Sequence, residues 1–192
     1  DTQGVKLGAC YETMMGDKPW EIVLENVRVP ASHRVGAEGE GMRYGQQWLN
    51  IGRLKHGAHA LGVAERCLEM ATSYAKQRST FGQPLANRQA IQWMLADMFI
   101  ELQAARLLVY KTAARLDAGE EAREEGYVAK YFADEMAFRA ADQCMQIHGG
   151  IALTTDLPIE KMWRQQRSYR ITEGATEVMK MVIARHVLRT YS

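Results

Sequence analysis

The hydrophobic pattern changes character about forty residues into the chain. In residues 1–38, the segments GVKLGACY and WEIVLENVRVP alternate between apolar and polar positions and are rich in β-branched residues. Gly16–Pro19 separates them as a turn, and Pro30 closes the second segment. Because two strands alone bury little, we expect them to belong to a sheet whose other strands lie outside this chain.

From about residue 42, apolar residues recur at steps of three and four, which predicts helices. We expect them over residues 42–78, 87–116, 121–147, 158–167 and 174–190. The stripe from Ile91 to Leu116 is unbroken, and Asp117-Ala118-Gly119 ends it. In the first helix the expected core positions are Tyr44, Trp48, Ile51, Leu61, Ala64, Leu68, Ala71 and Ala75. Long helices joined by short turns predict an all-α fold, an antiparallel four-helix bundle with a short N-terminal β segment.

Composition and charge narrow the classes of function. The net charge of +1 gives no large field of one sign, so we expect no nucleic-acid partner. No apolar run approaches the roughly 20 residues that span a membrane. Cys10, Cys67 and Cys144 share no ligand spacing and are expected to be reduced thiols. His148 has no second ligand at a helical spacing, so no metal site is expected.

Two segments resemble helix ends that could also bind a ligand. The first is Arg78-Ser-Thr-Phe-Gly82, followed by Pro84. It is equally well explained as a ligand-binding segment or as a plain helix end, with an arginine near the negative end of the helix dipole and a glycine turn. Gln146-Ile-His-Gly-Gly150 is either a plain glycine C-cap or a place where exposed backbone N–H groups admit a flat or phosphorylated ligand.

Two further segments contain charged groups in unusual places. Glu173, before Gly174 and the last helix, is either a charge partner of the helix N-terminus or a base directed into a cleft. Arg53, in Asn50-Ile-Gly-Arg53, lies among apolar neighbours and is either exposed or half of an ion pair. Taken singly, each segment favours the structural explanation.

The order and spacing of these segments together resemble the acyl-CoA dehydrogenase family over essentially the whole chain. The shared pattern runs from the Asn50–Arg53 element through R-x-x-F-G-x-P-L-x-x-x-Q, LADM (Leu95 to Met98) and Q-I-x-G-G to EG[TA] and IAR. The resemblance implies that residues 1–38 are the remnant of a middle β-domain and that residues 39–192 are the C-terminal helical bundle domain. The chain begins at Asp1 in what reads as a strand, so we expect it to be part of a longer polypeptide.

The resemblance also implies FAD as the cofactor, shared between subunits of a homotetramer. Matching positions place Arg78, Phe81 and Gln89 at the cofactor of an adjacent subunit. Gln146, Ile147, His148, Gly149 and Gly150 match contacts to the cofactor's other end, and Ala175, Thr176 and Glu177 match further contacts. Asn50, Gly52, Arg53 and Gly174 match the region that contacts acyl-CoA, and Gly174 is expected to leave room for the thioester.

Glu173 matches the family's catalytic base, which takes the α-proton of the thioester while the β-carbon passes hydride to flavin N5. A weakly acidic proton requires a base that is close and partly desolvated. Some members carry the base directly before the arginine of the first bundle helix, but here that position is Gly52. The chain departs from the common pattern at Asn50, where Asp is frequent, and at Ala175, where Thr is frequent.

The resemblance further implies an electron-transferring flavoprotein as electron acceptor, and a cytoplasmic location in a bacterium or a mitochondrial one in a eukaryote. Two alternatives stay open at this point. The first is an oxidase-like flavoenzyme of the same fold, and the second is a non-catalytic helical assembly module.

Overall fold

The computed structural model describes residues 2–191, and the chain divides between Gln47 and Trp48 into two compact units. The N-terminal unit contains an antiparallel hairpin of β1 (Val5–Cys10) and β2 (Trp20–Leu24), with Leu7 opposite Ile22, followed by a 3₁₀ turn, η1 (Ala31–His33). Leu7 and Ile22 are each 64% exposed, so this hairpin leaves its apolar side chains uncovered by its own unit. A sheet completed by other strands remains our prediction for this segment.

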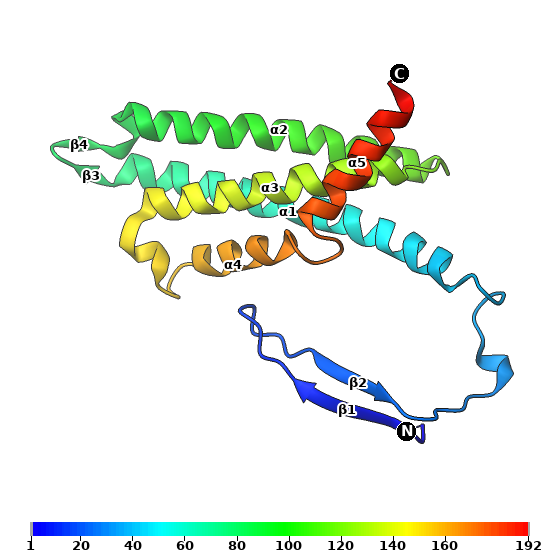
Figure 1. Cartoon of the computed structure of the whole chain (residues 1–192). Coiled ribbons are helices and arrows are strands. Elements are labelled where there is room, and N and C mark those ends of the chain that lie inside the picture. The colour runs from blue at the N-terminus through cyan, green and yellow to red at the C-terminus, as the bar shows by residue number, and fades with distance from the viewer. Residues whose placement is uncertain (1, 192) are drawn as a thin grey trace. The chain divides into compact units, whose positions relative to one another are not determined.

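The C-terminal unit is helical, although its first helix begins before the boundary, at Gly41. Every helix expected from the sequence is present, with ends that differ by no more than two residues. The helices are α1 (Gly41–Gln77), α2 (Gln89–Asp117), α3 (Arg123–His148), α4 (Ile159–Tyr169) and α5 (Thr176–Thr190). Chain direction alternates from α1 to α4, and α5 crosses α3 (Figure 1). The fold is therefore the all-α, antiparallel four-helix bundle expected from the periodicity.

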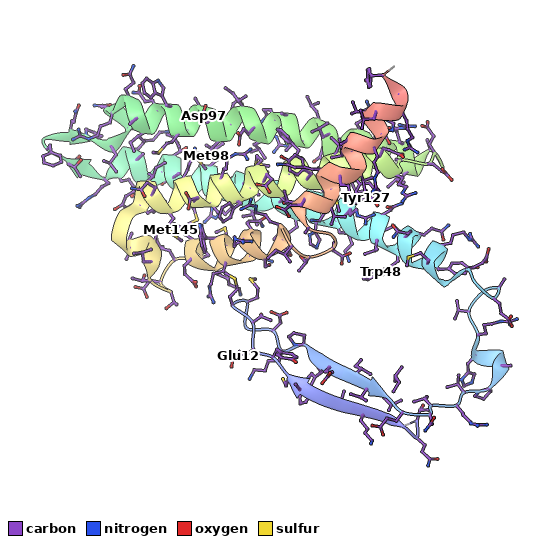
Figure 2. All side chains as sticks on the ribbon, viewed as in Figure 1. Glu12, Trp48, Asp97, Met98, Tyr127 and Met145 are labelled. Carbon is purple, nitrogen blue, oxygen red and sulfur yellow. The ribbon has the colours of Figure 1, made fainter. Side chains whose placement is uncertain are left out.

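Helix α3 is the centre of the bundle, because it packs against α2, α4 and α5. The core shared by the four helices α1, α2, α3 and α4 is rich in alanine. Its members Ala64, Ala71, Ala133 and Ala137 are each no more than 1% exposed. Small side chains at a contact let helix axes approach closely. Larger residues complete the core from α2, where Met98 faces the other helices and Asp97 faces outward (Figure 2).

The connections between the helices are tighter than the sequence predicted. The segment after α1 forms a small hairpin of β3 (Ser79–Thr80) and β4 (Gln83–Pro84) and then a 3₁₀ turn, η2 (Leu85–Asn87). Phe81 and Gly82 at its tip both have positive φ, +52° and +79°, as a two-residue type I′ turn requires. A further 3₁₀ turn, η3 (Gly149–Leu153), stands where the sequence indicated only a loop.

Two of the expected core positions were wrong. Trp48 and Ile51 in α1 are 66% and 60% exposed, whereas Leu61, Ala64, Ala71 and Ala75 are buried as expected and Tyr44 and Leu68 are partly buried. Helical periodicity identifies an apolar face but does not say what covers it. In this chain Trp48 and Ile51 line a pocket, which is described next.

Candidate active site

The turn between α4 and α5 directs the side chain of Glu173 against α1. A Cβ atom placed on Gly52 would lie 2.9 Å from Oε2 and 3.2 Å from Cδ of Glu173. No side chain fits at Gly52 while Glu173 keeps this position. The structure thus brings together two residues, far apart in the sequence, that were both expected at the reaction centre.

The backbone of this turn is unusual. Glu173 has φ of +55°, a left-handed conformation that non-glycine residues rarely adopt, and Gly174 has φ of +109°. The turn is closed by the N–H of Thr176, which donates to the carbonyl of Arg170 at 3.0 Å. The space expected beside Gly174 is occupied by Met179, because a Cβ on Gly174 would lie 2.3 Å from its Cε. Local strain of this kind is concentrated at functional sites.

Glu173 forms one wall of a pocket of about 310 Å³ within the helical unit. The ring of Tyr169 stacks on His56, with centroids 4.1 Å apart, and meets His59 edge-on at 5.2 Å. Burial, and next the neighbouring His56, lower the pKa of His59 although Asp134 acts in the opposite direction, which favours a neutral imidazole. The lining residues are Trp48, Ile51, Gly52, Lys55, His56, His59, Tyr169 and Glu173.

The carboxylate of Glu173 has a free oxygen. Its Oε2 atom is buried, and no group in residues 2–191 hydrogen-bonds to it. A buried polar atom without a partner is uncommon and calls for an explanation. A carboxylate oxygen without a partner, on a residue that lines a pocket, is free to accept a proton from a ligand bound there.

Arg53 is a buried cation that interacts with Glu173, and it is 4% exposed. Its Nη1 donates to Oδ1 of Asn50 at 2.7 Å, and its guanidinium lies 4.2 Å from the ring centroid of Tyr127 (labelled in Figure 2). Burial lowers the pKa of Arg53, while Tyr127 and Glu173 act in the opposite direction. Asn50 and Arg53 therefore bind one another within α1, and Arg53 supplies positive charge beside the carboxylate.

A second pocket, of about 500 Å³, is lined by five of the residues that were expected at a cofactor: Arg78, Ile147, His148, Gly149 and Gly150. His148 stacks on Tyr74, with centroids 4.4 Å apart, and its Nδ1 lies 2.8 Å from the carbonyl of Cys144. Gly149 has φ of +67°, and nothing lies within 4 Å of a Cβ placed on it or on Gly150. The lining residues are Tyr74, Arg78, Thr80, Leu85, Ile147, His148, Gly149, Gly150 and Ile151.

The other expected cofactor residues lie outside both pockets. Phe81, at the tip of the β3–β4 hairpin, is 97% exposed, with Arg88 over its ring at 5.5 Å. Thr176 is buried, and its hydroxyl donates to Oε1 of Glu135 at 2.7 Å. The remaining positions are at helix ends, where Gln89, Gln146 and Glu177 are exposed and Ala175 is partly buried.

Sequence reasoning missed a group of polar residues behind Glu173. Lys130 and Asp134 are each 2% exposed or less and form an ion pair in α3 with Nζ and Oδ2 3.0 Å apart. Glu135 accepts from Arg170 and Thr176. The available signal was a lysine and an aspartate at i, i+4 on a helix face that also carries Ala133 and Ala137.

Residues 2–191 contain no cluster of three or more His, Cys, Asp or Glu side chains arranged to hold a metal ion. In the same part of the chain, no helix combines the length and apolar character needed to cross a membrane. Cys67 and Cys144 are buried and Cys10 is exposed, and all three are free thiols.

Comparison with known proteins identifies the family. The family model described as acyl-CoA dehydrogenase, C-terminal domain, matches residues 39–188. A 3-(aryl)acrylate reductase of Clostridium sporogenes is 41% identical over 189 residues, which is 97% of this chain and 50% of that protein. The solved butyryl-CoA dehydrogenase of Megasphaera elsdenii superposes with a TM-score of 0.90 at 36% identity, covering 98% of this chain and 50% of that one.

A chain in a solved structure described as the electron transferring flavoprotein of Acidaminococcus fermentans superposes with a TM-score of 0.91 at 36% identity. It covers 98% of this chain and 50% of that chain. The chain thus spans about half the length of the proteins that it matches. By its sequence and its helical bundle, the chain belongs to the acyl-CoA dehydrogenase family and contains the C-terminal domain of that family.

Proposed function

We propose that this chain is part of an FAD-dependent acyl-CoA dehydrogenase that converts an acyl-CoA thioester to the trans-2-enoyl-CoA, with Glu173 as the acceptor of the α-proton. One observation carries the proposal: Glu173 lines the pocket, and its Oε2 is buried without a hydrogen-bond partner beside the bare backbone of Gly52. Family membership alone would not assign this role to a residue.

The chemistry explains why a carboxylate suits this place. Glu173 takes the α-proton, and the electrons of that C–H bond form the α,β double bond as hydride leaves the β-carbon. FAD, when bound, supplies the hydride acceptor. The base must lie within hydrogen-bond reach of the proton and must have no competing partner, and Oε2 meets the second condition. The N–H of Glu173 is proposed to polarise the thioester carbonyl.

The second pocket fits a phosphate-containing cofactor such as FAD. Arg78 offers a positive charge there, and the open backbone at Gly149 and Gly150 lets a ligand approach main-chain N–H groups. Ala175, Thr176 and Glu177 stand at the start of α5, where a helix N-terminus favours an anion. We therefore keep as cofactor contacts Arg78, Phe81, Gln89, Gln146, Ile147, His148, Gly149, Gly150, Ala175, Thr176 and Glu177, with Phe81 directed to a neighbouring subunit.

For the substrate we propose an acyl-CoA held near Asn50, Gly52, Arg53 and Gly174. Gly52 is the best supported of these, because its missing side chain leaves the carboxylate of Glu173 in contact with the α1 backbone. Gly174 acts through its backbone, since Met179 fills the space beside its Cα.

We propose a homotetramer that exchanges electrons with an electron-transferring flavoprotein. The uncovered Phe81 supports a contact between subunits. The similarity to a chain in the solved structure named for the Acidaminococcus fermentans flavoprotein supports the electron partner.

The reverse direction is a second candidate, because one relative is named as a reductase of an aryl acrylate. The same residues would then work backward, with protonated Glu173 giving its proton to the α-carbon. An oxidase would use the same base but would pass electrons to O₂.

The test uses the full-length protein that contains this chain, purified and examined for bound flavin. The probes are butyryl-, octanoyl-, cyclohexanecarbonyl- and 3-phenylpropionyl-CoA, added without oxygen. We expect yellow protein whose flavin absorbance is bleached by at least one thioester, with the matching enoyl-CoA as product. Bleaching that air reverses rapidly would indicate an oxidase. Colourless protein that binds none of the four thioesters would refute the proposal and favour an assembly module.

A further inference from the structure

Lys130 places an ammonium group inside the helical bundle, where two backbone carbonyls and one carboxylate surround it. It is 1% exposed. Its Nζ lies 2.9 Å from the carbonyl oxygen of Tyr169, 3.0 Å from that of Gly174 and 3.0 Å from Oδ2 of Asp134. A lysine ammonium has three donors and no acceptor; two of them bind these carbonyls, and Asp134 compensates the charge as an ion pair.

Two of those partners stand at the ends of the segment that carries Glu173. Tyr169 is the last residue of α4, and Gly174 directly follows Glu173. Lys130 therefore fixes the carbonyls on either side of a turn in which Glu173 has φ of +55°. Without an external constraint, a non-glycine residue would tend to leave this conformation.

Glu135, one residue beyond Asp134, holds the same segment from a second point. Its Oε1 accepts from Nε of Arg170 at 2.8 Å and from the hydroxyl of Thr176 at 2.7 Å. The contacts to α3 thus occur at residues 169, 170, 174 and 176, and Glu173 lies between them.

Stability alone does not explain a buried lysine–aspartate pair. Removing two charges from water is costly, and replacing such a pair by apolar residues of similar size is often neutral or stabilising. What Lys130 provides beyond volume is hydrogen bonding, because an apolar side chain could fill the same space but could not bind two carbonyls.

We infer that Lys130, paired with Asp134, is a positioning residue for Glu173: it holds the turn 169–174 so that the carboxylate faces Gly52 and the pocket. This inference rests on the proposed role of Glu173 as base. Lys130 is not a lining residue of the pocket, but it binds the backbone carbonyl of Tyr169, which is one.

The experiment compares variants of the full-length flavoprotein in anaerobic stopped flow, using whichever of the four thioesters above bleaches the wild type. The test variant is Lys130→Met/Asp134→Asn, which removes both charges and leaves neither buried without a partner. We expect the bleaching rate per bound flavin at saturating thioester to fall about 10- to 100-fold, as a displaced catalytic group should cause. We expect the dissociation constant of the thioester to change less than threefold.

The control is Arg139→Met/Glu101→Gln, which removes a partly exposed ion pair between α3 and α2, with Nη2 and Oε2 3.0 Å apart. It should bleach at the wild-type rate. A merely structural role for Lys130 would lower the yield of flavoprotein but leave the rate per flavin unchanged, and that result would overturn the inference. If the test variant does not fold, Lys130→Arg is measured by the same criterion, since it keeps a cation but misplaces its donors. Glu173→Gln separates the two claims: if that variant bleaches normally, the proposed function fails before the positioning question arises.

Discussion

The carboxylate of Glu173 lies where a side chain at position 52 would begin. A Cβ at that position would approach Oε2 to 2.9 Å, closer than real Cβ contacts allow, so either the helix or the carboxylate would have to move. The carboxylate is the more mobile of the two, because it ends a side chain on a turn. A single methyl group at position 52 therefore tests how strictly the base must be placed.

We expect Gly52→Ala in the full-length enzyme to lower the anaerobic bleaching rate by about 10²-fold, since a shift of about 1 Å in a catalytic group can have that effect. The matched control is Gly62→Ala on the same helix, where nothing lies within 4 Å of the new Cβ. Gly62→Ala should bleach normally and should be about 0.5–1 kcal/mol more stable, as expected when alanine replaces a helical glycine. Equal rates for the two variants would contradict this account of the site.

Glu173 and Gly52 could be proposed as site residues from the sequence because short motifs mark their positions. Lys130, Asp134 and Glu135 were not, because their spacing along α3 is also that of any i, i+4 pair on a helix surface. Only the packing of α4 and α5 against α3 reveals that they are covered. The prediction that Trp48 and Ile51 lie in the core was wrong for the opposite reason. Their spacing is that of core positions, but their side chains line a pocket.

At the scale of elements, the turn from α4 to α5 depends on charges supplied by α3. Burial acts to raise the pKa of Glu135, but the hydrogen bonds from Thr176 and Arg170 and the charge of Arg170 outweigh it and lower the pKa below its ordinary value of 4.5. When the pKa of a carboxylate is lower in the folded state than in the unfolded state, the carboxylate stabilises the fold at pH values above its unfolded-state pKa. This stabilisation is lost as the pH falls through the folded-state pKa.

We therefore expect the 192-residue chain to lose stability below about pH 4.5, and Glu135→Gln to lose less over the same range. The measurement is the urea midpoint at several pH values between neutral and acidic. Glu69→Gln is the control, because Glu69 is 60% exposed in a surface pair with Arg66. It should follow the wild type. If Glu135→Gln and Glu69→Gln have the same pH dependence, the lowered pKa contributes nothing to the fold.

The helices themselves were predictable, and their order was too, because the three-and-four spacing survives over many turns. The sequence did not specify which helix would complete the bundle. The shared core takes Ile159 from α4, whereas the buried Met179 of α5 lies outside that core. By length, α5 would be expected to be the fourth helix of the bundle. The chain turns back after η3, however, so that the shorter α4 runs along α3 instead (Figure 1).

At the scale of the whole molecule, one face of α2 is apolar and uncovered. Trp93, Ile100 and Leu107 recur every seven residues and are 61%, 64% and 74% exposed. Tyr110, on the same side of the helix, is 64% exposed. A stripe of this kind on a helix surface is typical of a protein interface.

We expect the 192-residue chain to self-associate through this stripe, and Ile100→Glu/Leu107→Glu to shift it toward monomer. Sedimentation velocity over a range of concentrations measures the effect. The control Arg66→Gln/Lys76→Gln, at two exposed positions on α1, makes the same change in net charge and should associate like the wild type. A wild-type chain that stays monomeric at the highest concentration would contradict the prediction.

The central claim is that Glu173 is the base. The most direct measurement is the anaerobic bleaching of the full-length flavoprotein by saturating thioester, compared between wild type, Glu173→Gln and the exposed-carboxylate control Glu69→Gln. The amide keeps the size and polarity of the side chain but cannot accept a proton. We predict that Glu173→Gln still binds FAD and thioester but bleaches at least ~10²–10⁴-fold more slowly, the usual cost of losing a positioned base, while Glu69→Gln bleaches normally. Bleaching of Glu173→Gln at a rate near that of the wild type would contradict the assignment.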